Sequence, residues 1–143
     1  MKKLLFILFI CFSVLSFSQS ARDINLIIQK TLDLHALKDK YNEDEKSGKI
    51  PLIIINDDKI PNNLIVFKFN KRVKIMTFDE IETFKSIYKG NLDSYFIFEN
   101  IEFNDDFTEV VIDAKFRKTD AIPVHVSMKK ENNNWVVVES KAG

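Results

Sequence analysis

Apolar and polar residues alternate along the C-terminal part of the chain with the period of two that is typical of strands. The alternation is clearest over residues 107–117, where apolar side chains occupy even positions and charged ones mostly odd positions. Short loops rich in Asn, Asp and Lys separate this segment from three similar ones, and such loops favour pairing of consecutive strands. The pattern predicts a four-stranded antiparallel meander over residues 94–103, 107–117, 122–130 and 135–139.

The numbering also predicts what each face of this sheet carries. Directly opposed residues of an antiparallel pair share a face, so the even-numbered apolar residues should form the core face. These are Phe96, Phe98, Val110, Ile112, Ala114, Phe116, Val124, Val126, Met128, Val136 and Val138. The odd face mixes charged and large apolar groups. A purely solvated face would not carry so many apolar groups, so we expect the N-terminal strands, a second copy, a partner or a ligand to cover part of it.

The region before the meander predicts two helices and several short strands. Apolar residues recur at three- and four-residue steps over residues 21–46, which predicts a helix with one buried stripe and Asp23 as its N-cap. Thr77 and Glu80 form a capping box that starts a second helix, ending near Gly90. Continuous or alternating apolar runs predict strands over residues 50–56, 64–69 and 73–76. The predicted fold class is therefore α+β.

The first residues have the pattern of a secretory leader. Two lysines precede an apolar run, and Ser16 and Ser18 suit cleavage before Gln19, with cleavage after Ser20 as the alternative. The run is shorter than the ~20 residues of a membrane-spanning helix. We therefore predict a signal peptide over residues 1–18 and a single α+β domain over residues 19–143, exported to the periplasm or secreted, with no transmembrane segment in the mature chain.

The only cysteine, Cys11, lies inside this leader. Ile10 stands where a lipoprotein signal needs a small residue, so we do not expect a lipid anchor at Cys11. Apolar content of 45% and charged content of 29% are ordinary for a globular domain. The chain has 21 basic and 21 acidic side chains, and this balance gives no support to nucleic-acid binding.

Few residues offer catalytic or metal-binding chemistry. The mature chain has no cysteine and only two histidines, His35 and His125, so we predict no metal site and no cofactor. Asp113 and His125 share the odd face on adjacent predicted strands, where the carboxylate can orient the imidazole as a general base. The alternative is a solvated cross-strand pair that contributes ~0.2–1 kcal/mol. His35 lies off the apolar stripe, and we expect it to be exposed.

Basic residues gather around the predicted hairpin near residue 70. Lys68, Lys71, Arg72 and Lys74 flank Phe67 and Phe69. The cluster predicts either a surface that contacts anions or an edge hairpin whose lysines prevent strands of neighbouring molecules from pairing with it.

The end of the chain is similar to a known class of domains. Trp135-Val136-Val137-Val138 follows the charged and polar segment Lys129-Lys130-Glu131-Asn132-Asn133-Asn134. Over residues 93–139 the pattern resembles the C-terminal half of cystatin-like or nuclear-transport-factor-like α+β domains. The resemblance implies a curved antiparallel sheet with a helix on its concave face, although strands over residues 52–76 depart from the simplest cystatin-like order. Such folds include binders, inhibitors, immunity proteins and a few enzymes, so the fold alone does not assign the function.

The mixed face suggests three functional interpretations. The first is a protein-binding domain, inhibitor-, immunity- or adaptor-like, that contacts another protein or a second copy of itself through an apolar patch. The patch residues are Tyr95, Ile101, Phe103, Phe107, Val111 and Trp135. The second is a cone-shaped pocket that binds a small ligand or catalyses a reaction with Asp113 and His125. In the third, the strands over residues 52–76 cover the face as a second core layer.

Overall fold

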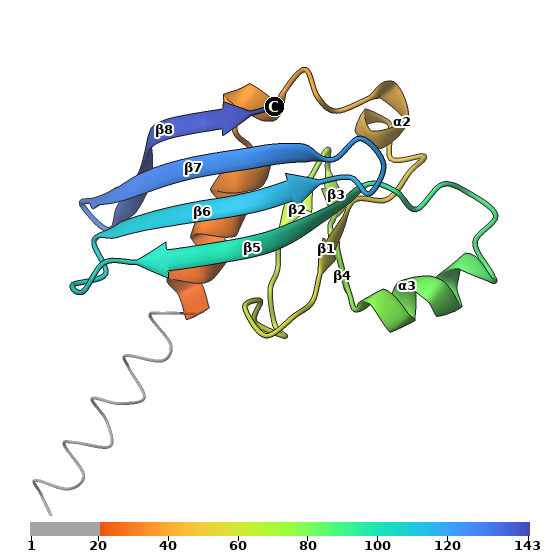
Figure 1. The fold of residues 1–143 in the computed structure, drawn as a ribbon, viewed down its shortest axis with the longest axis horizontal. Helices are drawn as coiled ribbons and strands as arrows, with labels where there is room; N and C mark the ends of the chain where they lie inside the picture. Colours follow the sequence, from red (N-terminus) through yellow and green to blue (C-terminus); the bar gives the residue numbers. More distant parts are fainter. Residues whose placement is uncertain (1–20) are drawn as a thin grey trace, which may run out of the picture.

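The computed structural model describes residues 21–143. They form a six-stranded mixed sheet in the order β4-β1-β5-β6-β7-β8 and a separate two-stranded hairpin, β2-β3 (Figure 1). The elements are, in chain order, a helix over residues 21–32, η1 (His35–Leu37), α2 (Glu43–Lys46), β1 (Ile53–Ile55), β2 (Phe67–Lys68), β3 (Lys71–Arg72), β4 (Lys74–Met76), α3 (Phe78–Lys85), β5 (Tyr95–Phe103), β6 (Glu109–Phe116), β7 (Ile122–Glu131) and β8 (Asn134–Ala142). The predicted signal peptide and Cys11 lie outside the described residues.

The α+β class is confirmed, but the sheet has six mixed strands and is not the four-stranded antiparallel meander that the sequence predicted. The strands β5 to β8 pair antiparallel in sequence. Beyond β5, however, β1 pairs parallel with β5, and β4 pairs parallel with β1. The physical reason lies in β1, whose three isoleucines are all buried. A strand that is apolar on both faces is stable only inside a sheet, with a neighbour on each side.

The N-terminal segment is not one long helix. Leu34 has an extended backbone (φ −55°, ψ 133°) that separates the helix over residues 21–32 from η1. Asn42 and Glu45 then form a capping box that starts α2. Asp23 lies within the first helix and is not its N-cap; its carboxylate accepts a hydrogen bond from Trp135 Nε1 (3.1 Å). The capping box of Thr77 and Glu80 is confirmed at the start of α3.

Two irregularities limit the prediction that even-numbered residues of the sheet face the core. The register shifts between Phe98 and Asn100 in β5, and between Ser127 and Met128 where β7 pairs with β8. An extra residue reverses the direction of every side chain that follows it. The predicted core positions of β6 and β7 are therefore buried, whereas Val136 and Val138 in β8 are 41% and 67% exposed.

The two faces of the sheet carry separate clusters of apolar residues. The larger cluster joins the strands to the helix over residues 21–32. The smaller one lies on the other face, where Ile81 of α3 packs with Ile53, Ile55, Leu92 and Tyr95. Part of the odd face is therefore covered by α3, while β1 and β4 extend the sheet beside β5 and do not lie over it. None of the helices in the described part of the chain is long and apolar enough to cross a membrane.

Candidate functional site: a cleft along the edge strand β4

The six residues of the predicted apolar patch do not form one surface. Trp135 and Tyr95 are buried, and they belong to different apolar clusters. Ile101 and Phe103 follow the irregularity in β5 and pack against the larger cluster. Their predicted position on the odd face is wrong, as it is for Trp135, because the extra residue in each strand reverses the face. The exposed members of the set are Phe107 and Val111.

Asp113 and His125 do lie side by side, directly opposite each other on β6 and β7. Asp113 Oδ1 and His125 Nδ1 are 2.7 Å apart, and the two side chains are 45% and 44% exposed. They border a depression shared with Glu99 and Lys141. Tyr95 and Trp135 do not line this depression and are buried in the apolar clusters. No group of three or more His, Cys, Asp or Glu suited to a metal ion occurs within residues 21–143.

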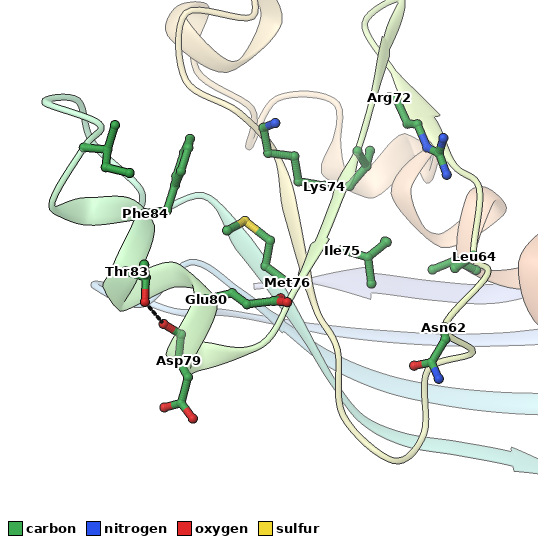
Figure 2. Close-up of a pocket in the computed structure, with 12 residues that line it drawn as sticks. Asn62, Leu64, Arg72, Lys74, Ile75, Met76, Asp79, Glu80, Thr83 and Phe84 are labelled. Atoms are coloured by element: carbon green, nitrogen blue, oxygen red, sulfur yellow. Dashed lines mark hydrogen bonds between the residues drawn. The ribbon is translucent and has the colours of Figure 1, made fainter.

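A cleft of about 790 Å³ lies along β4, an edge strand of the sheet. Figure 2 places Met76 and Phe84 on one side of β4, and Ile75 and Leu64 on the other. The cleft therefore extends over the edge of the sheet and reaches both of its faces. The lining residues are Asn62, Leu64, Arg72, Val73, Lys74, Ile75, Met76, Asp79, Glu80, Thr83, Phe84 and Ile87.

The backbone of β4 has one edge towards β1 and one towards the cleft. Lys74 donates its N–H to the carbonyl of Leu52 (3.0 Å), and the carbonyl of Met76 accepts from Asn56 N–H (2.8 Å). Alternate residues of a parallel strand form hydrogen bonds on opposite sides, so the N–H and C=O of Ile75 point away from β1. Within residues 21–143, no strand of the sheet pairs with β4 on that side.

Two side chains of the first helix explain why the neighbouring segment does not close over β4. Asn25 exchanges two hydrogen bonds with the backbone of Ile65 (2.8 and 2.9 Å). Gln29 does the same with the backbone of Phe67 (2.8 and 3.0 Å). Residues four apart share one side of a helix, so these amides act as a substitute partner strand. Val73 N–H still donates to the carbonyl of Val66 (2.9 Å), so the segment leaves β4 beyond Val73 and the cleft opens there.

The opposite wall is held in place by the start of α3. Thr77 Oγ1 accepts from Glu80 N–H (3.1 Å), and Glu80 Oε2 accepts from Thr77 N–H (2.8 Å). Ile81 anchors the helix on the smaller apolar cluster, beside Tyr95, whose pKa is raised by burial. The helix was expected to end near Gly90, but α3 ends at Lys85, and Ile87 beyond it is 75% exposed. It adds an apolar side chain to the wall of the cleft.

Charges divide the cleft along its length. Arg72 and Lys74 lie where β4 begins, and Asp79 and Glu80 lie where β4 leads into α3 (Figure 2). The ammonium group of Lys74 lies 5.8 Å from the centre of the Phe84 ring. The sequence signal for this site was the basic cluster around residue 70. Two of its members line the cleft, but the shape of the cleft depends on contacts between residues that are far apart in the sequence.

No protein-family model, curated protein or solved structure matches the chain. The resemblance to cystatin-like or nuclear-transport-factor-like domains therefore stays a prediction.

Proposed function

We propose that the protein binds an extended segment of another polypeptide along β4. One observation carries this proposal: the outward-facing backbone of Ile75 lies inside a cleft with apolar walls. A peptide that adds to the edge of a sheet gains main-chain hydrogen bonds, and its side chains point alternately to the two faces. The cleft offers a partly exposed apolar surface to each set, Met76 and Phe84 on one face and Ile75 on the other.

The dimensions suit a short strand. The three residues of β4 span about 10 Å at ~3.3 Å per residue, so a bound segment of about four to six residues covers the strand and both ends of the cleft. The volume of about 790 Å³ falls within the ~300–1,000 Å³ that is common for binding sites. Loss of water from Phe84 and Ile87 on binding favours the complex in proportion to the apolar area buried.

This function keeps the inhibitor- or adaptor-like interpretation of the sequence and moves its site from the odd face to β4. The alternative function built on Asp113 and His125 rests on their 2.7 Å contact beside a depression, and we favour it less. Nearly half of each side chain is exposed, and the water around them would screen both groups.

The test uses a phage-displayed library of random nonapeptides, selected against the purified protein. A selected peptide should bind about tenfold more weakly to Ile87→Asp, because the added charge must be desolvated against the apolar wall. The matched control is Val138→Asp, which places the same charge at a comparably exposed valine on β8 (67% exposed). Binding of the peptide should also slow the hydrogen exchange of the Ile75 amide, measured by NMR.

Two results would contradict the proposal. One is a selected peptide that binds the Ile87→Asp and Val138→Asp variants equally well. The other is a peptide that binds without any change in the exchange of the Ile75 amide.

A further inference from the structure

A second cavity adjoins the cleft where β4 begins. It measures about 400 Å³ and shares Arg72, Val73, Lys74 and Phe84 with the cleft. Its other walls come from residues 48–52, from the β2-β3 hairpin and from Tyr88. The Tyr88 hydroxyl donates to the carbonyl of Lys49 (2.8 Å) and joins two of these walls. We call this cavity the basic chamber.

The basic chamber has an excess of positive charge. Its basic residues are Lys49, Lys68, Lys71, Arg72 and Lys74, and its one acidic residue is Glu45. The side chain of Glu45 is fully buried and forms an ion pair with Arg117 (3.0 Å), so it is not available to neutralise the chamber.

Some of these cations have partners elsewhere. Lys68 pairs with Asp33 (2.7 Å) and Lys49 with Asp44 (3.7 Å). No carboxylate in the described part of the chain forms an ion pair with Lys71, Arg72 or Lys74. Arg72 and Lys74 line both the basic chamber and the start of the cleft, whereas Lys71 lines the chamber alone and donates to the carbonyl of Gly48 (3.2 Å). Guanidinium and ammonium groups bind a carboxylate through charge-assisted hydrogen bonds.

The direction of a bound strand follows from the two charged ends. An antiparallel strand would place its C-terminus at the start of β4, beside Arg72 and Lys74, and its N-terminal part beside Asp79 and Glu80. A parallel strand would bring its C-terminus to these two carboxylates, where like charges repel each other. Antiparallel pairing is also slightly more stable per residue.

We infer that the strand bound along β4 is the C-terminal end of its polypeptide, with its free carboxylate in the basic chamber. This inference rests on the proposed function. The terminal carboxylate is favoured over an acidic side chain because Val66 already accepts from Val73 N–H (2.9 Å), so a strand paired along β4 has to leave this edge near Lys74. The partner is thus a protein with an extended, apolar C-terminal segment.

The experiment compares forms of one peptide, selected from a library displayed with free C-termini. The free acid should bind about tenfold more tightly than the C-terminal amide. The affinity of the free acid should exceed, by a similar factor, the affinity of an amidated peptide that carries one additional Asp at its end. Lys74→Gln should remove most of the difference between acid and amide. The control Lys59→Gln removes an exposed lysine outside both cavities and should leave the difference unchanged.

A nitroxide spin label at the N-terminus of the peptide reports its direction. It should broaden the amide signals of Asp79 and Glu80 more than those of Arg72 and Val73. Equal affinity of acid and amide, or broadening at Arg72 instead, would overturn the carboxylate inference. If Ile87→Asp still weakens binding in that case, strand addition at β4 stands; if it has no effect, the proposed function fails as well.

Discussion

The six-stranded sheet has two edge strands, which differ in their length and in what surrounds them. One edge, β4, has three residues and lies in a cleft between α3 and the segment around Leu64. The other edge, β8, has nine residues. Its valines at positions 136, 137 and 138 are 41%, 38% and 67% exposed. In Figure 1 the two edges lie on opposite sides of the sheet.

The difference shows that the surroundings of an edge, and not its hydrogen-bonding groups, decide what can pair with it. An open apolar edge offers the same row of donors and acceptors to any strand, including a strand of a second copy. A partner strand of the kind proposed for β4 would have to be narrow enough to enter the cleft and to match its walls and charges. Under the proposed function, selectivity would reside in α3 and in Asn25 and Gln29, whose amides hold the neighbouring segment away from β4.

The largest expected effect comes from the anchor of the β8 edge. Trp135 is 1% exposed, and its indole N–H donates to Asp23. Trp135→Ala removes this bond and leaves a cavity, so the free energy of unfolding should fall by about 3–5 kcal/mol, measured by urea denaturation. Val136→Ala, at the exposed neighbouring position, should change it by less than about 0.5 kcal/mol. A loss below about 1 kcal/mol for Trp135→Ala would show that the edge is anchored elsewhere.

A smaller effect is expected at the wall of the β4 cleft. Thr77→Ala removes the side-chain cap of α3 and should lower the free energy of unfolding by about 1 kcal/mol. Because α3 carries one wall of the cleft, the same variant should weaken peptide binding, measured by isothermal titration calorimetry. Thr77→Ser keeps a hydroxyl at the cap and should restore both properties. Unchanged peptide binding by Thr77→Ala would show that the cap of α3 does not contribute to the shape of the cleft wall.

The smallest effect on stability is expected on the open face of β8. Val138→Lys should change the free energy of unfolding by less than about 0.5 kcal/mol, because the side chain is 67% exposed. It should nevertheless lower self-association at high protein concentration, since a lysine on an edge strand opposes pairing with a second edge. Light scattering over a concentration series measures this. The control Ile65→Lys adds the same charge at an exposed residue outside the six-stranded sheet, and an equal decrease there would mean a general effect of charge.

Local patterns in the sequence predicted the parts of the fold that depend on near neighbours. The alternation of β6 and β7 identified their buried positions, and Thr77 with Glu80 identified the start of α3. A single alternation over the whole of β5 or β8 does not describe these strands, because one extra residue exchanges their two faces. In β5 the sequence carries a trace of this, since the apolar positions change from Phe96 and Phe98 to Ile101 and Phe103. The two irregularities account for the wrong placement of Ile101, Phe103 and Trp135.

The cleft was harder to predict for a related reason. Its shape depends on Asn25 and Gln29 binding a segment about forty positions away, and on the parallel pairing of β1 with β4 and β5. A pattern read along the chain does not record such contacts. The basic residues near position 70 pointed to the correct region, but not to its role as one end of a cleft.

The parallel pairing of β1 also has a consequence for the order of folding. The strands β5 to β8 are joined by short turns, whereas β1 must meet β5 across a long intervening segment. Closing a longer loop costs more chain entropy and slows the formation of the contacts that depend on it. The four C-terminal strands can therefore associate first, with β1 and β4 docking afterwards. Under the proposed function, a strand bound along β4 would extend this late-forming edge of the sheet by one more strand.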